Sequence, residues 1–161
     1  MISRTAEYAL RAMVFLAMAP DEARTVRQIA AGTKVPEGYL SKVMQSLGRA
    51  GLVRSQRGLH GGFSLDREAA ELSILEVVNA VDPVARIRTC PLGLAAHGKR
   101  LCPMHRRLDD AAAMVENAFG KSLLVELLAE PTTSKPLCDF PATAAVAARA
   151  TKARAGRRRR R

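Results

Sequence analysis

The chain has 161 residues, of which 48% are hydrophobic, 4% are aromatic and none is tryptophan, and its formal net charge is +11. No run approaches the roughly 18 consecutive apolar residues that cross a bilayer, and no signal-peptide pattern opens the sequence, so we expect a cytoplasmic protein without a membrane partner. Eight basic and no acidic residues lie in the tail 149–161, which leaves 18 basic and 15 acidic residues, a net charge of +3, on residues 1–148. The tail either attracts polyanions without sequence preference or is a solvated segment with no defined partner.

Capping residues and apolar spacing predict two helices near the start of the chain. One covers residues 3–18, where apolar side chains recur at helical spacing and Ser3 is a suitable N-cap. The other covers residues 26–31, with Thr25 as its N-cap. Gly32 stands just beyond this second helix, where a glycine often ends one.

A third helix and a hairpin follow. Pro36 suits the first position of a helix over residues 36–50, because proline has no N–H to leave unpaired there. The pattern then changes to two short strands, 52–55 and 63–65, joined by the glycine-rich segment 56–62. A helix pair followed by a glycine-tipped hairpin is typical of the winged helix-turn-helix, a mainly α fold with a small β-hairpin wing.

The second half of the chain predicts one more short helix and one long one. Ser73 is a suitable N-cap for a helix over 74–81, and residues 84–102 form a loop without periodicity. Pro103 begins a long helix, and a last helical turn or two covers 122–130. Along the long helix, apolar residues spaced by four and three form a seam that indicates either a dimerisation helix or packing onto its own domain. The seam consists of Met104, Leu108, Ala111, Val115 and Ala118.

The helix-turn-helix and the hairpin together predict a DNA interface. Slim polar side chains at the front of the third helix suit entry into the major groove, where hydroxyl, amide and ammonium groups bond to base edges. Basic side chains and glycines at the wing tip suit contact with phosphates or the minor groove. The alternatives are packing for Tyr39 and a solvated face for Lys42. The predicted DNA-binding residues are Gln28, Glu37, Gly38, Tyr39, Ser41, Lys42, Gln45, Arg57, His60, Gly61 and Gly62.

Cysteines and histidines gather in the loop before the long helix. Cys90, His97, Cys102 and His105 supply thiolate and imidazole groups, which suit an iron–sulfur cluster or zinc. Cys102 precedes a helix N-terminus, whose dipole favours the thiolate. The alternative is a pair of thiols with no special role. Cys138 lies in the predicted disordered tail, and we expect it to be a thiol rather than a ligand.

The ordered motifs resemble one known family. The stretches GYL (38–40) and GRAGLVRSQRGLHGGFSL (48–65), together with AEYALRAM (6–13), are similar to the Rrf2 family of bacterial transcription regulators. The resemblance covers roughly residues 1–130 and implies a homodimer that binds palindromic promoter sites. The family includes regulators of iron–sulfur cluster synthesis, of the response to nitric oxide and of cysteine metabolism.

The resemblance also implies a ligand set for the loop. Cluster-binding members carry three cysteines spaced six and six, and here Cys90 and Cys102 match the outer two while Ala96 replaces the middle one. His105 falls where some members place a histidine ligand, and Glu7 falls where others use a carboxylate from the other subunit; His97 is a further donor. A [2Fe–2S] cluster fits this set better than a [4Fe–4S] cluster. A thiol sensor without a cluster and a zinc site stay open as alternatives.

We therefore expect three regions: a DNA-binding domain over 1–83, a sensor loop and dimerisation helix over 84–130, and a disordered basic tail over 131–161. The expected function is that of a homodimeric repressor whose affinity for operator DNA responds to redox, iron or nitric-oxide status. The rival is an interaction protein that uses the same helices for protein contacts. An enzyme is disfavoured, because no P-loop, dinucleotide-binding glycine pattern or nucleophile–base arrangement with supporting context is present.

Overall fold

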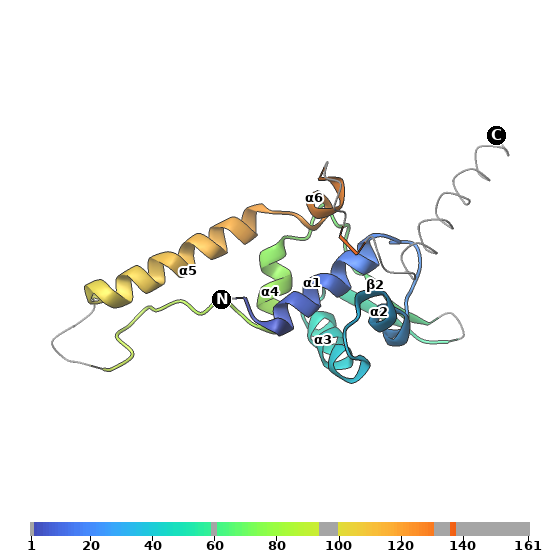
Figure 1. Ribbon diagram of the computed structural model, residues 1–161, viewed down its shortest axis with the longest axis horizontal. Coiled ribbons are helices and arrows are strands. Elements are labelled where there is room, and N and C mark those ends of the chain that lie inside the picture. Colours follow the sequence, from blue (N-terminus) through green and yellow to red (C-terminus); the bar gives the residue numbers. More distant parts are fainter. Residues whose placement is uncertain (1, 59–60, 94–99, 131–135, 138–161) are drawn as a thin grey trace.

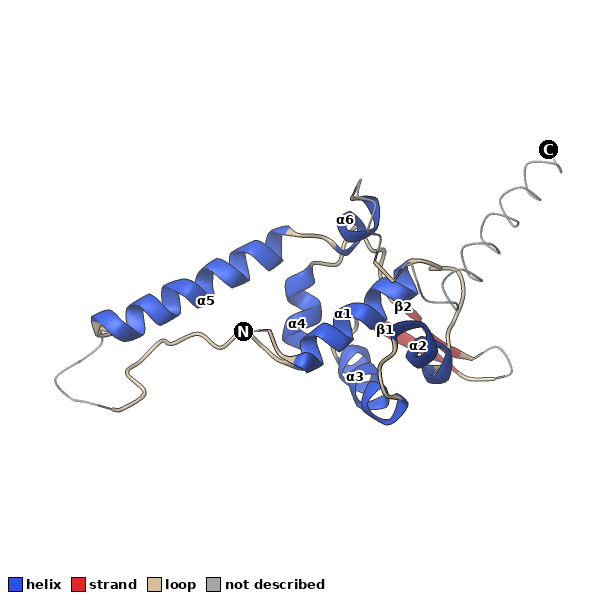
Figure 2. Cartoon of the chain, in the orientation of Figure 1, coloured by secondary structure: helices blue, strands red, loops and turns tan. Residues whose placement is uncertain are grey.

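The computed structural model describes residues 2–58, 61–93, 100–130 and 136–137 (Figures 1 and 2). Within these ranges the protein is mainly helical with one small hairpin, as predicted. The first three helices and the hairpin are followed by a short helix, a long helix and a last short helix. The elements are α1 (Arg4–Ala17), α2 (Val26–Thr33), α3 (Glu37–Arg49), β1 (Val53–Gln56), β2 (Gly62–Leu65), α4 (Ile74–Val81), α5 (Pro103–Lys121) and α6 (Leu124–Ala129).

Helix α2 begins as predicted and ends later than predicted. The Thr25 hydroxyl accepts a bond from the Gln28 amide (3.2 Å), and the Gln28 side chain accepts one from the Thr25 amide (2.8 Å). The helix continues through Gly32, and the chain leaves it at Lys34, which has the left-handed φ of 54°. The prediction that Gly32 ends the helix is wrong. A Cβ there would lie 2.1 Å from Cε2 of Phe15, so glycine lets α2 approach α1 closely.

Helix α1 lies at the centre of the core. It contacts α2, α3, α4 and α6 (Figure 1), and its side chain Met13 is fully buried among Leu40, Leu47 and Leu124. Leu124 belongs to α6, so after α5 the chain returns to the core around α1. This return is reinforced by backbone pairing between Ser73 and Leu123, just before α4 and α6. The core around α1 therefore includes residues from both ends of the described chain.

The two strands of the hairpin wing are antiparallel, and the outer edge of β2 pairs with one further residue, Arg24. The register of the hairpin pairs Val53 with Leu65, at the end of the hairpin away from the tip. On the other side of β2, Arg24 exchanges two backbone bonds with Phe63, at 2.8 and 2.7 Å. A Cβ at Gly62 would lie 2.5 Å from the backbone of Arg24, so this pairing requires a glycine. The wing is thus tied to the segment that precedes α2.

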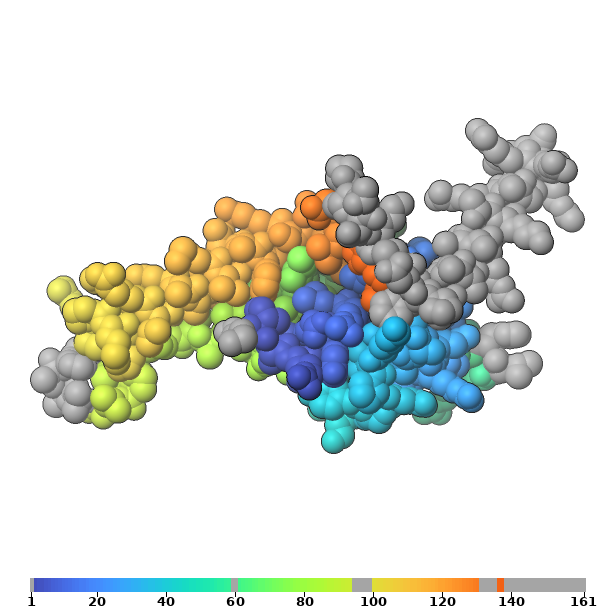
Figure 3. All heavy atoms as spheres, in the orientation of Figure 1, coloured from blue at the N-terminus to red at the C-terminus, as the bar shows by residue number. Residues whose placement is uncertain are grey.

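Helix α5 projects away from the core (Figures 1 and 3). Cys102 is its N-cap and Pro103 its first residue, as predicted, and its later turns contact α4. The described part of the preceding loop, 82–93, runs beside the helix (Figure 2). Among the described residues, no helix has the length and apolar character needed to cross a membrane.

Candidate DNA interface and Cys/His loop

The third helix presents the polar face that was predicted for it. Leu40, Val43, Met44 and Leu47 are buried in the core and fix the orientation of α3. The opposite face carries the predicted DNA-binding side chains, of which Ser41 is half-buried. The exposed members on α3 are Glu37, Gly38, Tyr39, Lys42 and Gln45.

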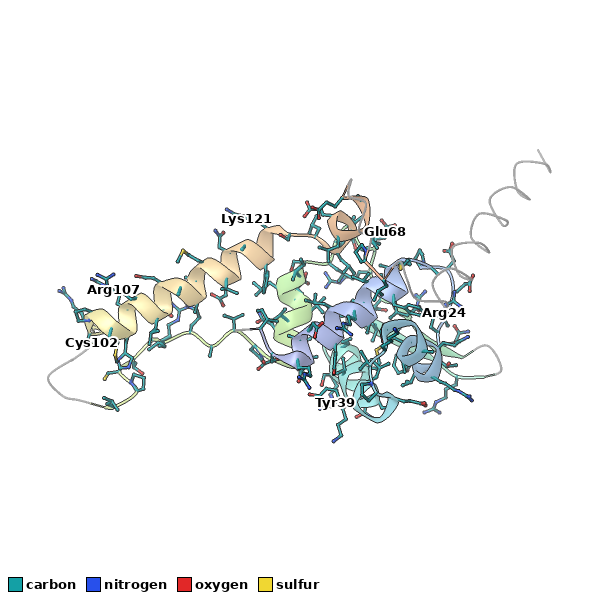
Figure 4. All side chains as sticks on the ribbon, in the orientation of Figure 1. Arg24, Tyr39, Glu68, Cys102, Arg107 and Lys121 are labelled. Carbon is teal, nitrogen blue, oxygen red and sulfur yellow. The ribbon has the colours of Figure 1, made fainter. Side chains whose placement is uncertain are left out.

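Tyr39 joins the front of α3 to α1. Its hydroxyl lies 2.5 Å from Thr5 Oγ1, and its ring meets the Tyr8 ring edge-on with centroids 5.5 Å apart. The side chain is nonetheless 43% exposed. Tyr39 (labelled in Figure 4) therefore has a structural role in holding α3 against α1, the packing alternative, while part of it stays open to solvent.

Two other predicted contact residues are bonded locally. Ser41 donates its hydroxyl hydrogen to the Glu37 carbonyl (3.0 Å), one turn earlier in α3. Gln28 forms the capping box with Thr25 at the start of α2. Both side chains lie on the elements expected to face DNA, but each would exchange a local bond for one to a base.

Close backbone contacts within the protein explain why the two wing positions 61 and 62 are glycines. A Cβ at Gly61 would lie 2.5 Å from the Gln56 carbonyl oxygen, and Gly62 approaches Arg24 equally closely. Close approach to DNA is therefore not needed to account for either glycine. Arg57 is exposed near the tip, whereas His60 lies outside the described residues.

At the far end of α5, the structure brings together two of the predicted ligands. Cys102 Sγ lies 3.4 Å from Nδ1 of His105, and the His105 side chain is buried although most of α5 is exposed (Figure 4). Cys90 and Cys102 are both half-buried and are not joined by a disulfide. His97 and Ala96 lie outside the described residues.

A single chain does not assemble the full predicted ligand set. Within the described ranges, no three His, Cys, Asp or Glu side chains are grouped closely enough to hold a metal ion. Glu7 forms an ion pair with Arg11 on α1, as their spacing predicts. The thiolate and imidazole of Cys102 and His105 suit a soft metal or a cluster, but they supply only two donors.

Arg11 extends this ion pair toward the helix-turn-helix. Its Nη1 donates to the Thr33 carbonyl (3.2 Å) at the end of α2, and its guanidinium lies 5.7 Å from the centroid of the Tyr8 ring. Tyr8 in turn touches Tyr39 on α3. A continuous set of contacts thus runs from Glu7 to α3.

Sequence reasoning missed the group that fastens the loop to α5. Arg86 donates to both carboxylate oxygens of Asp109, at 2.7 and 2.8 Å, and to Glu116 at 2.6 Å. Asp109 also accepts the Ile87 amide (2.9 Å). The bonds from Arg86, and after them the bond from the Ile87 amide, lower the pKa of Asp109 to about 2. The carboxylates of Asp109 and Glu116 in turn raise the pKa of Arg86. Asp109 and Glu116 are seven apart, or two helical turns, and so lie on one face of α5; this spacing of two carboxylates is the signal that could have indicated a shared cation.

An apolar groove lies between α5 and the core. Its volume is about 630 Å³, and its walls come from the start of α1, the end of α4 and the seam side of α5. All five seam residues are exposed in the chain. The apolar lining includes Ile2, Ala6, Val78, Leu108, Val115 and Phe119.

The fold and the exposed polar face of α3 define a DNA-binding transcription regulator of the winged-helix class. The chain belongs to the Rrf2 family, described as iron-dependent transcriptional regulators, whose profile matches residues 2–130. This is a family of regulators and not of enzymes.

Relatives and solved structures agree with this assignment. The regulator NsrR of Geobacillus kaustophilus is 30% identical over 137 residues, which cover 81% of this chain and 91% of that protein. The structure of T. potens IscR superposes with a TM-score of 0.67 at 20% identity, covering 82% of this chain and 88% of the other. CymR, the global cysteine regulator of B. subtilis, superposes with a TM-score of 0.66 at 22% identity, covering 82% and 98%. The two superpositions establish a shared fold.

Proposed function

We propose that this regulator is a homodimeric repressor that reads operator DNA with α3 and the wing, and whose affinity for DNA responds to the state of the Cys/His loop. The observation that carries the DNA-binding part is the exposed polar face of α3, held rigidly by its buried apolar face. Gly38 on that face has no protein atom within 4 Å of a Cβ built on it. The protein's own packing therefore does not require glycine there, whereas close approach to a base pair would.

The homodimer is supported by the apolar seam of α5. Met104 and Leu108 are 59% and 54% exposed, which is unusual for a row of large apolar side chains on one helix. The adjoining groove has the apolar lining that α5 of a second copy would fill. We therefore propose that residues 84–130 form the dimerisation and sensing region, and residues 1–83 the DNA-binding region.

A second copy would also complete the sensor. Cys102 and His105 supply two donors from one chain, Cys90 lies on the adjoining loop, and Glu7 of the other subunit supplies a carboxylate. A bound [2Fe–2S] cluster would supply one-electron redox chemistry at this site. The cluster-free thiol sensor is the second candidate, because Ala96 cannot replace the middle cysteine and no group of three donors occurs among the described residues. Zinc is the third.

Recruitment of Glu7 as a ligand would alter the contacts of α3. Glu7 is paired with Arg11, and Arg11 holds the Thr33 carbonyl immediately before the turn into α3. If Glu7 left this ion pair, the Arg11 guanidinium would lose its carboxylate partner and would form other contacts. The contacts that run from Arg11 through Tyr8 to Tyr39 would then shift. This route links ligation to α3 through direct contacts rather than through proximity alone.

The test is an absorption spectrum of protein purified without oxygen, with iron and sulfide counted in the same sample. Absorption in the region of roughly 400 nm with matching iron and sulfide supports the cluster. A colourless protein that contains neither iron nor sulfide would favour a sensor based on the thiols or on zinc. Operator footprints of wild type and of the Cys90→Ser/Cys102→Ser variant, compared with and without oxidant, then test the response. Identical footprints under every condition would show that the loop does not control DNA binding.

A further inference from the structure

A second groove separates α3 from the wing. It has a volume of about 540 Å³ and lies between the later turns of α3 and strand β1. Arg49 enters its wall from α3, and Arg54 enters it from β1. Two guanidinium groups from different elements therefore converge on one groove, although neither belongs to the predicted DNA-binding set. The remaining wall residues are Met44, Gln45, Gly48, Val53, Ser55 and Phe63.

The charge on this groove is not neutralised by the protein. Among the described residues, neither Arg49 nor Arg54 forms an ion pair, whereas four other arginines each pair with a carboxylate. Strand β1 has no acidic residue, and the one acidic residue of α3, Glu37, stands at the opposite end of the helix. The groove therefore presents two positive charges to solvent with no acidic residue on either element beside them.

Both arginines are oriented by bonds that leave their outer nitrogens available. Arg54 Nε donates to the Ser64 hydroxyl (3.1 Å) across the hairpin, and Arg49 Nε donates to the Gln45 carbonyl (3.4 Å) within α3. Neither bond uses an Nη group. A guanidinium held through Nε still offers paired N–H groups, which match the oxygens of a phosphate.

We propose that Arg49 and Arg54 form a phosphate-binding pair that holds the backbone of the DNA duplex against the groove between α3 and β1. The inference rests on the proposed operator binding and adds a site to it. Gln45 lies on the polar face of α3 and also lines this groove, so a duplex read by that face passes over the two arginines. Phosphate contacts of this kind set the register of the protein on DNA and carry no base preference.

The experiment measures affinity against salt concentration for a duplex enriched by the full-length protein from a randomised pool. Each phosphate contact contributes about 0.9 to the slope of log affinity against log salt. Each arginine occurs twice in a dimer, so Arg49→Ala or Arg54→Ala should each make the slope shallower by about 1.8. The preference for the enriched duplex over a scrambled duplex should not change.

Three variants serve as controls. Arg49→Lys/Arg54→Lys retains the charge and should retain most of the slope, which separates charge from folding. Lys121→Ala removes a charge from the C-terminal end of α5, on the side of the molecule away from α3 (Figure 4), and should leave the slope unchanged. Thermal unfolding of every variant checks whether Arg49 only stabilises the end of α3.

The outcomes separate the inference from the proposed function. If wild type enriches a duplex and Arg49→Ala/Arg54→Ala keeps the wild-type slope, the phosphate pair is wrong. If that double variant loses preference for the enriched duplex, the arginines read bases and the assignment is also wrong. If wild type enriches no duplex, operator binding itself fails.

Discussion

Truncating Leu108 should weaken a dimer built on the seam of α5 without unfolding the chain. Leu108 is 54% exposed, so about half of its side chain remains to be buried by a partner. Burying a whole leucine side chain is worth about 1.5–3 kcal/mol, and the remaining half about 1 kcal/mol. A symmetric dimer contains the residue twice, so Leu108→Ala should cost about 2 kcal/mol and raise the dimer dissociation constant about 30-fold.

Sedimentation equilibrium over a range of protein concentrations measures this constant directly. Asn117→Ala is the matched control, because Asn117 is exposed on the same helix but on the face opposite the seam. Thermal unfolding of the two variants, extrapolated to low concentration, verifies that the fold is intact. A dissociation constant for Leu108→Ala equal to that of Asn117→Ala would refute the seam as the interface, and a monomeric wild type would refute the homodimer.

Three further outcomes follow from packing and charge. The pKa of Asp109 is lowered from 3.8 to about 2, so its bond to Arg86 stabilises the loop above pH 3.8 and is lost as the pH falls from 3.8 toward 2. The amide of Ile87 donates to Asp109, so its resonance should report that transition in wild type. In Arg86→Gln the midpoint should rise toward 3.8, because the bonds from Arg86 are the largest cause of the lowered pKa, and an unchanged midpoint would contradict the ion pair. Gly32→Ala should destabilise the chain by about 1–2 kcal/mol in urea unfolding, because overpacking against Phe15 outweighs the gain of about 1 kcal/mol in helix propensity, and a more stable variant would contradict it. Deleting the tail 149–161 should make the salt dependence of operator binding shallower while preference is kept, and a loss of preference would show that the tail reads sequence.

Short-range signals predicted most of the secondary structure. Thr25 and Ser73 cap α2 and α4 through bonds to residues three positions ahead, and α4 has the predicted bounds Ile74–Val81. The pairing of Glu7 with Arg11 is equally local, since residues four apart share a helix face. Features of this kind depend on neighbours within one helical turn and are therefore readable from the sequence.

For the candidate site, local spacing predicted which side chains lie near one another within one helix, but not how separate elements meet. The spacing of Cys102 and His105 placed both in the first turn of α5, where they lie close together. The groove position of Arg49 and Arg54 was not predictable, because it depends on how the hairpin folds back beside α3. The ligand role proposed for Glu7 depends on a second subunit and cannot be tested in the structure of one chain.

The sequence by itself determined the order of the helices, the hairpin and the family to which this regulator belongs. Some helix boundaries differ from the prediction: α2 continues through Gly32, and Pro36 is the N-cap of α3 rather than its first residue. Only the tertiary structure decided why Gly32 and Gly62 are glycines, since each faces a segment that is distant in the chain. It also decided that Arg86 joins the loop to α5, across 23 residues. The physical reason is that caps and periodicity act over three or four residues, whereas close packing and ion pairs between distant segments arise only once the elements have assembled.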